Sequence, residues 1–88
     1  MFGADVAALR GLARSLRHKQ EEIEATRRRL ANVVDHLPWV GGDRDRFTDE
    51  WRRVHSHALT TVVSELGAAS GQAEYHADRQ ERASRRHD

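Results

Sequence analysis

In the stretch Leu37-Pro38-Trp39-Val40-Gly41-Gly42-Asp43, the helical pattern of this 88-residue chain breaks once. Pro38 has no N–H and clashes with the preceding turn, so a helix must end at or just before it. Gly41 and Gly42 can adopt a positive φ, which allows the chain to reverse its direction. Asp43 is a good N-cap, and its carboxylate suits the positive end of a helix dipole. The stretch therefore predicts a helix, a tight turn that carries Trp39, and a second helix.

The first arm, about residues 4–37, contains no proline and repeats an apolar residue at every seventh position. The repeating set is Leu9, Leu16, Ile23, Leu30 and Leu37. A companion set lies three residues ahead of it: Val6, Ala13, Gln20, Arg27 and Val34. Such a repeat predicts a helix that supercoils against a partner helix. Its polar members, Gln20 and Arg27, either reach solvent at a loosely packed seam or select the register and the partner.

The second arm, about residues 44–84, carries a broad apolar face. One stripe recurs at intervals of three, four or seven: Phe47, Trp51, Val54, Ala58, Val62, Ala69 and Ala73. Three more residues lie beside it: Leu59, Val63 and Leu66. Past Leu66 the stripe thins, and Gly67 and Gly71 weaken the helix. We therefore expect a less stable segment from about Gly71 and a polar, mobile tail at the C-terminus.

The predicted fold is all-α: an antiparallel helix-turn-helix hairpin in one domain, with the turn at residues 38–43. One facing helix cannot cover the apolar face of the second arm, which spans nearly half of the circumference. A second hairpin packed alongside would cover it in a four-helix bundle. The residues expected at that dimer interface are Leu9, Leu16, Ile23, Leu30, Leu59, Val62 and Leu66.

Composition limits the functions open to the chain. Hydrophobic residues make up 38% and charged residues 33%, a thin supply for a self-sufficient core. The net charge of +1 argues against a dedicated nucleic-acid binder. Glutamates precede the triple arginine Arg27-Arg28-Arg29, so pairs such as Glu24 with Arg28 predict a solvated helix face there. No apolar run approaches a membrane span, and residues 1–16 lack the apolar core of a secretory signal peptide.

Nothing in the sequence predicts catalysis. The six histidines are scattered, and no two have the four-residue spacing of a helical zinc site. His55 and His57 point about 200° apart on a helix and cannot share a metal ion. No nucleophile has a base beside it in the sequence pattern, and no phosphate-binding loop is recognisable. We expect a non-enzymatic protein without a cofactor or a metal.

The turn and the start of the second arm form the pattern W-x-G-x-D-x-D-x-F-x-x-x-W. Its residues are Trp39, Gly41, Asp43, Asp45, Phe47 and Trp51, with Pro38 ahead of them. This pattern, set between two helical arms, resembles the WXG100 (ESAT-6-like) family, particularly its actinobacterial members. The resemblance implies helical hairpins that pair as homodimers or heterodimers into antiparallel four-helix bundles. It also implies substrates or co-substrates of the type VII (ESX) secretion system, made in the cytoplasm and exported without a cleaved signal peptide.

The resemblance assigns Trp39 and Gly41 to one half of a composite export signal. The family's other half is a Y-x-x-x-D/E motif on the C-terminal arm. Here the fourth residue after Tyr75 is Arg79, and the nearest acid is Asp78, three residues on. Tyr75 and Asp78 can still share a helix face and serve as a degenerate signal.

Several partners and roles remain open at this stage. The pairing partner is the chain itself or a paralogous WXG100 chain, in addition to the secretion machinery. An alternative is an adaptor that escorts a larger effector or toxin and is not secreted on its own. A nucleic-acid or membrane-surface binder is less favoured by the charge balance, and a structural coiled coil leaves the turn motif unexplained. Neither a nucleic acid nor a small-molecule substrate is expected.

Overall fold

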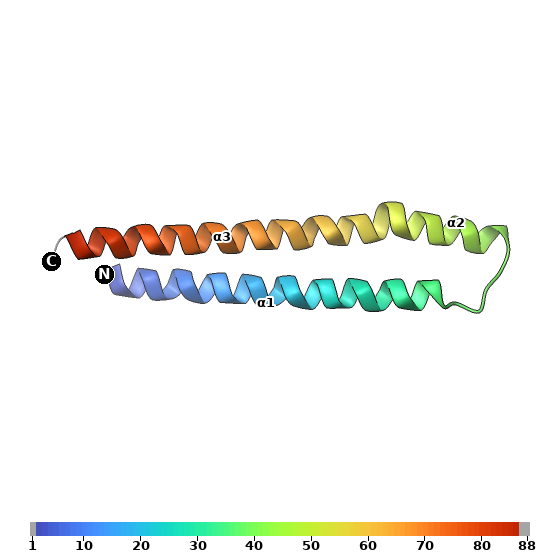
Figure 1. Ribbon diagram of the computed structural model, residues 1–88, viewed down its shortest axis with the longest axis horizontal. Helices are drawn as coiled ribbons and strands as arrows, with labels where there is room; N and C mark the ends of the chain where they lie inside the picture. Colours follow the sequence, from blue (N-terminus) through green and yellow to red (C-terminus); the bar gives the residue numbers. More distant parts are fainter. Residues whose placement is uncertain (1, 87–88) are drawn as a thin grey trace.

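The computed structural model describes residues 2–86, and the side chains from Asp5 onward. It is an antiparallel hairpin of two long helical arms joined at one end (Figure 1). The first arm is helix α1, Phe2–Asp35. The second arm runs without a break through helix α2 (Gly42–Glu50), the π-helical segment η1 (Trp51–Ser56) and helix α3 (His57–Arg86). The predicted all-α hairpin is confirmed, whereas the pairing of two hairpins stays a prediction.

The connection between the arms spans residues 36–41. α1 ends at Asp35, although the N–H groups of His36 and Leu37 still donate to carbonyl groups of its last turn. Gly41 has a φ of 113°, the left-handed region that glycine adopts without strain. Its carbonyl accepts a hydrogen bond from the N–H of Asp45 at 3.1 Å, so Gly41 is the N-cap of α2.

The prediction that Asp43 caps the second helix is therefore wrong. The helix begins at Gly42, which places Asp43 inside the first turn. The backbone reversal requires a positive φ at the cap itself, and this selects glycine over aspartate. Asp43 pairs with Arg46 and lies near the positive end of the helix dipole, where its charge is still favourable.

The seam between the arms follows a second heptad repeat on the C-terminal arm. Its members, all buried or half-buried, are Ser56, Leu59, Val63, Leu66, Ser70, Ala73, Ala77, Gln80 and Ser84. The most buried part is made of small side chains: Ser70, Ala73 and Ala77 of α3 and Ala13 of α1. The Ser70 hydroxyl donates to the Ala13 carbonyl at 2.9 Å, so the two backbones approach closely. Packing therefore continues beyond Leu66, and α3 stays helical through Gly71. The lower stability expected from about Gly71 stays a prediction.

The π-helical segment η1 explains why the apolar stripe divides into two sets. Inner residues recur at three or four positions elsewhere, but Trp51 and the next inner residue, Ser56, are five apart. The extra residue rotates the following helix by about 100° relative to an unbroken α-helix. As a result Trp51 stays half-buried in the seam, while Val54 and Val62 lie exposed on the outside.

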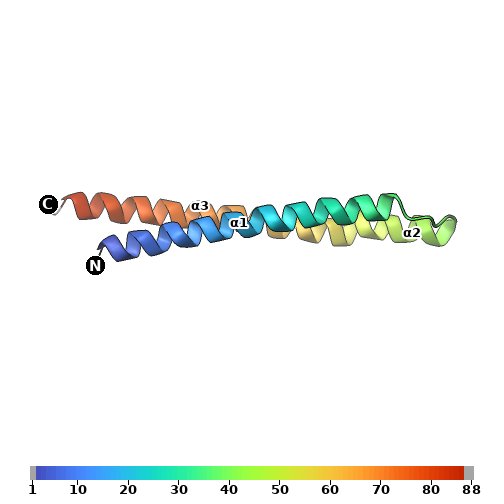
Figure 2. The ribbon, with the colours of Figure 1, turned by 90° about the horizontal axis from the view of Figure 1, so that it is seen from below.

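The hairpin is a thin rod of 70 × 16 × 12 Å, in which α1 crosses over α3 near the middle (Figure 2). Its radius of gyration is 19.8 Å, whereas a compact chain of this length would have about 12 Å. The accessible surface is 6591 Å², against about 5,300 Å² for a compact monomer of the same mass. The elongated hairpin therefore exposes more surface than a compact monomer of its mass.

The two glycines of α3 give a matched test of this packing. A methyl group at Gly71 would meet no atom within 4 Å, so Gly71→Ala should raise the free energy of unfolding by about 0.5–1 kcal/mol. A methyl group at Gly67 would lie 2.6 Å from the Gln20 amide nitrogen, so Gly67→Ala should gain less. Urea denaturation followed by circular dichroism at one protein concentration measures both. A loss of stability in Gly71→Ala would contradict the continuous, packed α3.

Candidate interaction surface

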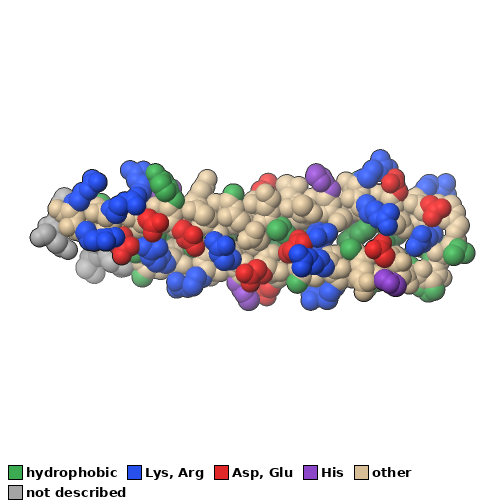
Figure 3. All heavy atoms as spheres, viewed as in Figure 1, with side chains coloured by type: hydrophobic (Ala, Val, Ile, Leu, Met, Phe, Trp, Pro, Cys, Tyr) green, Lys and Arg blue, Asp and Glu red, His purple; other side chains and the backbone are tan. Residues whose placement is uncertain are grey.

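The two flanks of the hairpin differ in character. On one flank Arg10 donates to Asp78 at 3.1 Å and to Glu81 at 2.6 Å. Further along the same flank Arg17 contacts Glu74 at 3.5 Å. The hydrogen bonds that Arg10 donates to Asp78 and to Glu81, in that order, raise the pKa of Arg10. Charged side chains of both signs cover much of the face seen in Figure 3, so this side is already satisfied within the chain.

The opposite flank carries several exposed apolar residues, and we call it the apolar flank. Leu12 lies two residues after Arg10, which places it about 200° away around α1. Leu12 is 51% exposed, and its counterpart three heptads later, Val33, is 57% exposed. On the other arm Val54 and Val62 are also exposed. On the first arm Lys19 and Thr26 occupy the two heptad positions between Leu12 and Val33, so the exposed apolar residues form separate patches. Exposed apolar patches are the kind of surface that another molecule covers.

The predicted dimer-interface residues fall on this apolar flank or at its border with the seam. Leu30 and Val62 are exposed, and five are half-buried: Leu9, Leu16, Ile23, Leu59 and Leu66. The half-buried side chains partly close the seam, so they are only partly free to contact a partner. Leu12 and Val33 are more exposed than any of the predicted set, and the signal for them was their position beside the leucine repeat.

A polar layer interrupts the seam at its middle. Arg27 donates to both carboxylate oxygens of Glu24, at 2.6 and 3.0 Å, and to the hydroxyl of Ser56 at 3.4 Å. The expected pair of Glu24 with Arg28 is confirmed at 3.2 Å. The hydrogen bond from Arg27 is the largest cause that lowers the pKa of Glu24 to about 2, and Arg28 adds to it. Arg27 therefore joins the two arms instead of extending into solvent.

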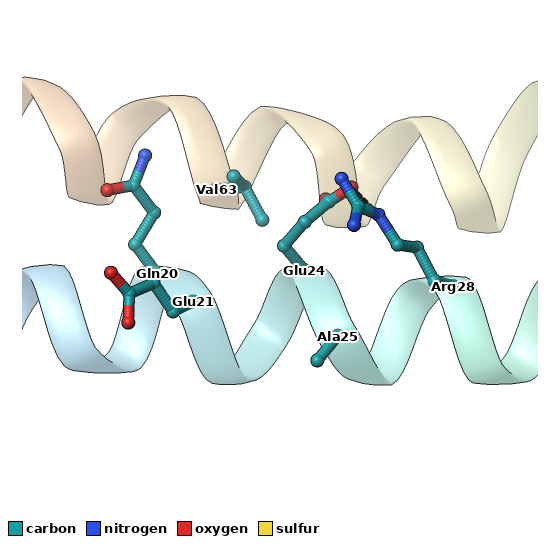
Figure 4. Close-up of a pocket in the computed structure, with 6 residues that line it drawn as sticks. All are labelled: Gln20, Glu21, Glu24, Ala25, Arg28 and Val63. Atoms are coloured by element: carbon teal, nitrogen blue, oxygen red, sulfur yellow. Dashed lines mark hydrogen bonds and ion pairs between the residues drawn. The ribbon is translucent and has the colours of Figure 1, made fainter.

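A groove next to this layer is lined by Gln20, Glu21, Glu24, Ala25, Arg28 and Val63 (Figure 4). Gln20 extends toward α3, where its amide lies over Gly67. Glu24 and Arg28 meet on the other side of the groove and satisfy each other. We assign no ligand to this groove because its ion pair is closed within the chain.

The turn motif presents an aromatic pair at the closed end of the rod. Trp39 is 41% exposed, and its ring lies 5.8 Å from that of Phe47. Val40 beside it is 90% exposed. Trp51 lies instead next to His55, with ring centroids 6.3 Å apart. The structure thus brings together Trp39 and Phe47 of the motif, whereas Trp51 is half-buried and has His55 as its ring neighbour.

The two residues of the candidate C-terminal signal, Tyr75 and Asp78, make separate contacts in this hairpin. Tyr75 is exposed, with the Arg79 guanidinium 5.8 Å from its ring centre and the ring of His76 at 5.6 Å. Asp78 is engaged by Arg10. Tyr75 and Trp39 lie toward opposite ends of the rod (Figure 1).

Two further observations concern metal ions and membranes. Within residues 2–86, no group of three or more histidine, cysteine or acidic side chains is placed to hold a metal ion. None of the helices described is long and apolar enough to cross a membrane.

Comparisons of the chain with protein-family models, with curated proteins and with solved structures find no match. The resemblance to WXG100 proteins is therefore carried by the turn motif and the arrangement of the arms alone.

The polar layer of Glu24 and Arg27 should make the free energy of unfolding depend on pH. In the unfolded chain Glu24 protonates near 4.5, and in the hairpin its pKa is about 2. A carboxylate with a lowered folded-state pKa stabilises above the unfolded value, and this stabilisation is lost as pH falls from about 4.5 toward 2. Glu24→Gln should flatten the fall in the free energy of unfolding over that range, as measured by urea denaturation at several pH values.

The matched control is Glu21→Gln, one turn earlier. Glu21 takes part in no ion pair among the residues described, so this variant should keep the wild-type pH slope. Equal slopes in the Glu24 variant and the wild type would show that the polar layer does not form in solution.

Proposed function

We propose that this chain is a small, non-enzymatic interaction protein of the WXG100 type, a substrate or co-secreted partner of a type VII secretion system. The observation that carries the proposal is the exposed Trp39-Val40-Gly41 turn at the closed end of a two-helix rod. Trp39 rests against Phe47 but keeps much of its ring in solvent, where a receptor can reach it. Export without a cleaved signal peptide is part of this proposal.

Pairing with a second hairpin is supported by the surface of the rod. Its accessible area exceeds that of a compact monomer by about 1,300 Å². One partner in a standard interface covers about 800 Å². The apolar flank supplies such a surface, whereas the flank of Arg10 and Glu81 would lose solvated ion pairs if it were covered. The partner is a second copy of the chain or a paralogous chain.

An antiparallel pair of hairpins would also bring the two halves of the export signal close together. Within one hairpin Trp39 and Tyr75 lie toward opposite ends. In an antiparallel bundle, the closed end of one hairpin lies beside the open end of the other. The Trp39 turn of one chain would then stand near Tyr75 of its partner.

A second version of the function has its own support. Arg79 contacts Tyr75 at the position where the family motif has an acid, and the neighbouring Asp78 is held by Arg10. A chain that lacks a free acid after the tyrosine would rely on its partner for that half of the signal. In this version the hairpin escorts a larger effector and is not exported alone.

Substitutions on the apolar flank test the pairing. Leu30→Ser combined with Val62→Ser should weaken association at least 10-fold, because a partner would bury both side chains. The hairpin itself should change little, since both residues are exposed in it. Light scattering and circular dichroism at matched concentrations measure mass and helicity, with Val40→Ser at the turn as the control. A wild-type chain that is a helical monomer would rule out self-pairing, and a poorly helical one would point to a missing partner.

Export itself is tested by Trp39→Ala in cells with a working type VII system. The variant should remain in the cells while its thermal stability stays nearly unchanged, because Trp39 is partly exposed and lies outside the seam. Val40→Ala is the matched control and should be exported normally. If the tagged wild-type chain is retained while a sister substrate leaves, autonomous export is wrong. A large loss of thermal stability in Trp39→Ala would count against a recognition role for the turn.

A further inference from the structure

Most charges of the last turns of α3 lie on two sides of the helix, with Arg85 on the acidic side, 3.9 Å from Glu81. The acidic residues face α1, where Glu74 contacts Arg17 and both Asp78 and Glu81 contact Arg10. The arginines at 79, 82 and 86 take no part in these contacts. The net charge of +1 for the whole chain does not reveal this local separation of acidic and basic side chains.

The basic side forms a straight line along the rod. Tyr75, Arg79, Arg82 and Arg86 recur at intervals of four, three and four residues, so they lie one above another on a single helix face. All four are exposed. Basic side chains line the outer edge of α3 toward the C-terminus in Figure 3. We call these four residues the basic edge.

Its arginines frame a shallow hollow of about 250 Å³, with Ala83 as the fourth lining residue. Among the residues described, no carboxylate lines this hollow. The Arg79 guanidinium lies 5.8 Å from the centre of the Tyr75 ring, so these two members of the basic edge contact each other. Arginine forks bind phosphate oxygens in pairs, so an anionic ligand fits this arrangement.

Helix stability alone does not account for the basic edge. Positive side chains are favoured in the last turn of a helix, where they complement the dipole. Arg86 lies in that turn, but Arg79 and Arg82 lie ahead of it. Their shared face needs another explanation.

We propose that the basic edge binds the phosphate groups of an anionic phospholipid surface. The edge of a straight rod touches a flat array of phosphates along its length, so the three arginines can engage at once. Tyr75 adds a ring of the amphipathic kind that is favoured at membrane interfaces. Duplex nucleic acid fits less well, because its phosphates follow a helical path away from a straight edge.

This inference does not rest on the proposed function. The basic edge lies on the side of α3 away from α1, and it is separate from the apolar flank of Leu12, Val33 and Val62. A paired hairpin therefore still presents its basic edge to a surface. Loss of export would leave the lipid contact untouched, and loss of the lipid contact would leave pairing untouched.

The test is co-sedimentation of the full chain with vesicles of phosphatidylglycerol and phosphatidylcholine at low salt, and with vesicles of phosphatidylcholine alone. The wild-type chain should bind only the anionic vesicles. Arg79→Gln, Arg82→Gln and Arg86→Gln in one chain should lower the partition coefficient on the order of 100-fold, since each arginine contributes about 1 kcal/mol near such a surface. Higher salt should weaken the wild-type binding.

The matched control carries Arg14→Gln, Arg29→Gln and Arg46→Gln, which remove the same charge from scattered exposed positions. It should keep most of the binding. A control that loses as much as the basic-edge variant would overturn the inference, because net charge alone would then explain the binding. It would also be overturned if the wild-type chain ignores anionic vesicles, or if it binds only duplex DNA or soluble pyrophosphate. Circular dichroism and light scattering confirm that both variants keep the helical content and mass of the wild type.

Discussion

The close approach of α1 and α3 through small side chains is the constraint on which the rest of the hairpin depends. Ala13, Ser70, Ala73 and Ala77 bring the backbones near enough for a direct hydrogen bond between the arms. Small side chains bury little apolar area, so this contact fixes direction and register more than it supplies hydrophobic stabilisation. The larger apolar side chains remain at or beside the flank, where another molecule can cover them.

The register is reinforced by polar groups that match across the seam. Arg27 bonds to Ser56, and Gln20 lies over the space that Gly67 leaves open. A slip of one heptad would separate these partners and leave polar groups against apolar ones, which is costly. The π-helical segment then sets which side of the second arm turns outward beyond Trp51. Together these features decide which apolar residues form the exposed flank.

Much of the fold follows from local chemistry that the sequence displays openly. Pro38 and the glycine pair predict the turn, and the leucine repeat predicts the first arm. The sequence did not predict which face of the second arm turns inward after Trp51. That face is set by the π-helical segment, which depends on tertiary packing and has no clear local signal. The tight seam near the C-terminus was missed for a related reason. Ser70 and Ala77 look like weak core residues, yet their small size is what allows the backbones to approach.

The candidate site was predictable in outline and not in detail, and electrostatics supplies the missing part. The sequence indicates a wide apolar face, but it does not say which flank a partner would avoid. Covering the flank of Arg10, Asp78 and Glu81 would strip water from charged groups, and their mutual attraction would not repay that loss fully. The charged flank therefore disfavours one mode of pairing while the apolar flank favours another. Selection of a partner geometry requires both effects, because specificity is a difference between two binding free energies.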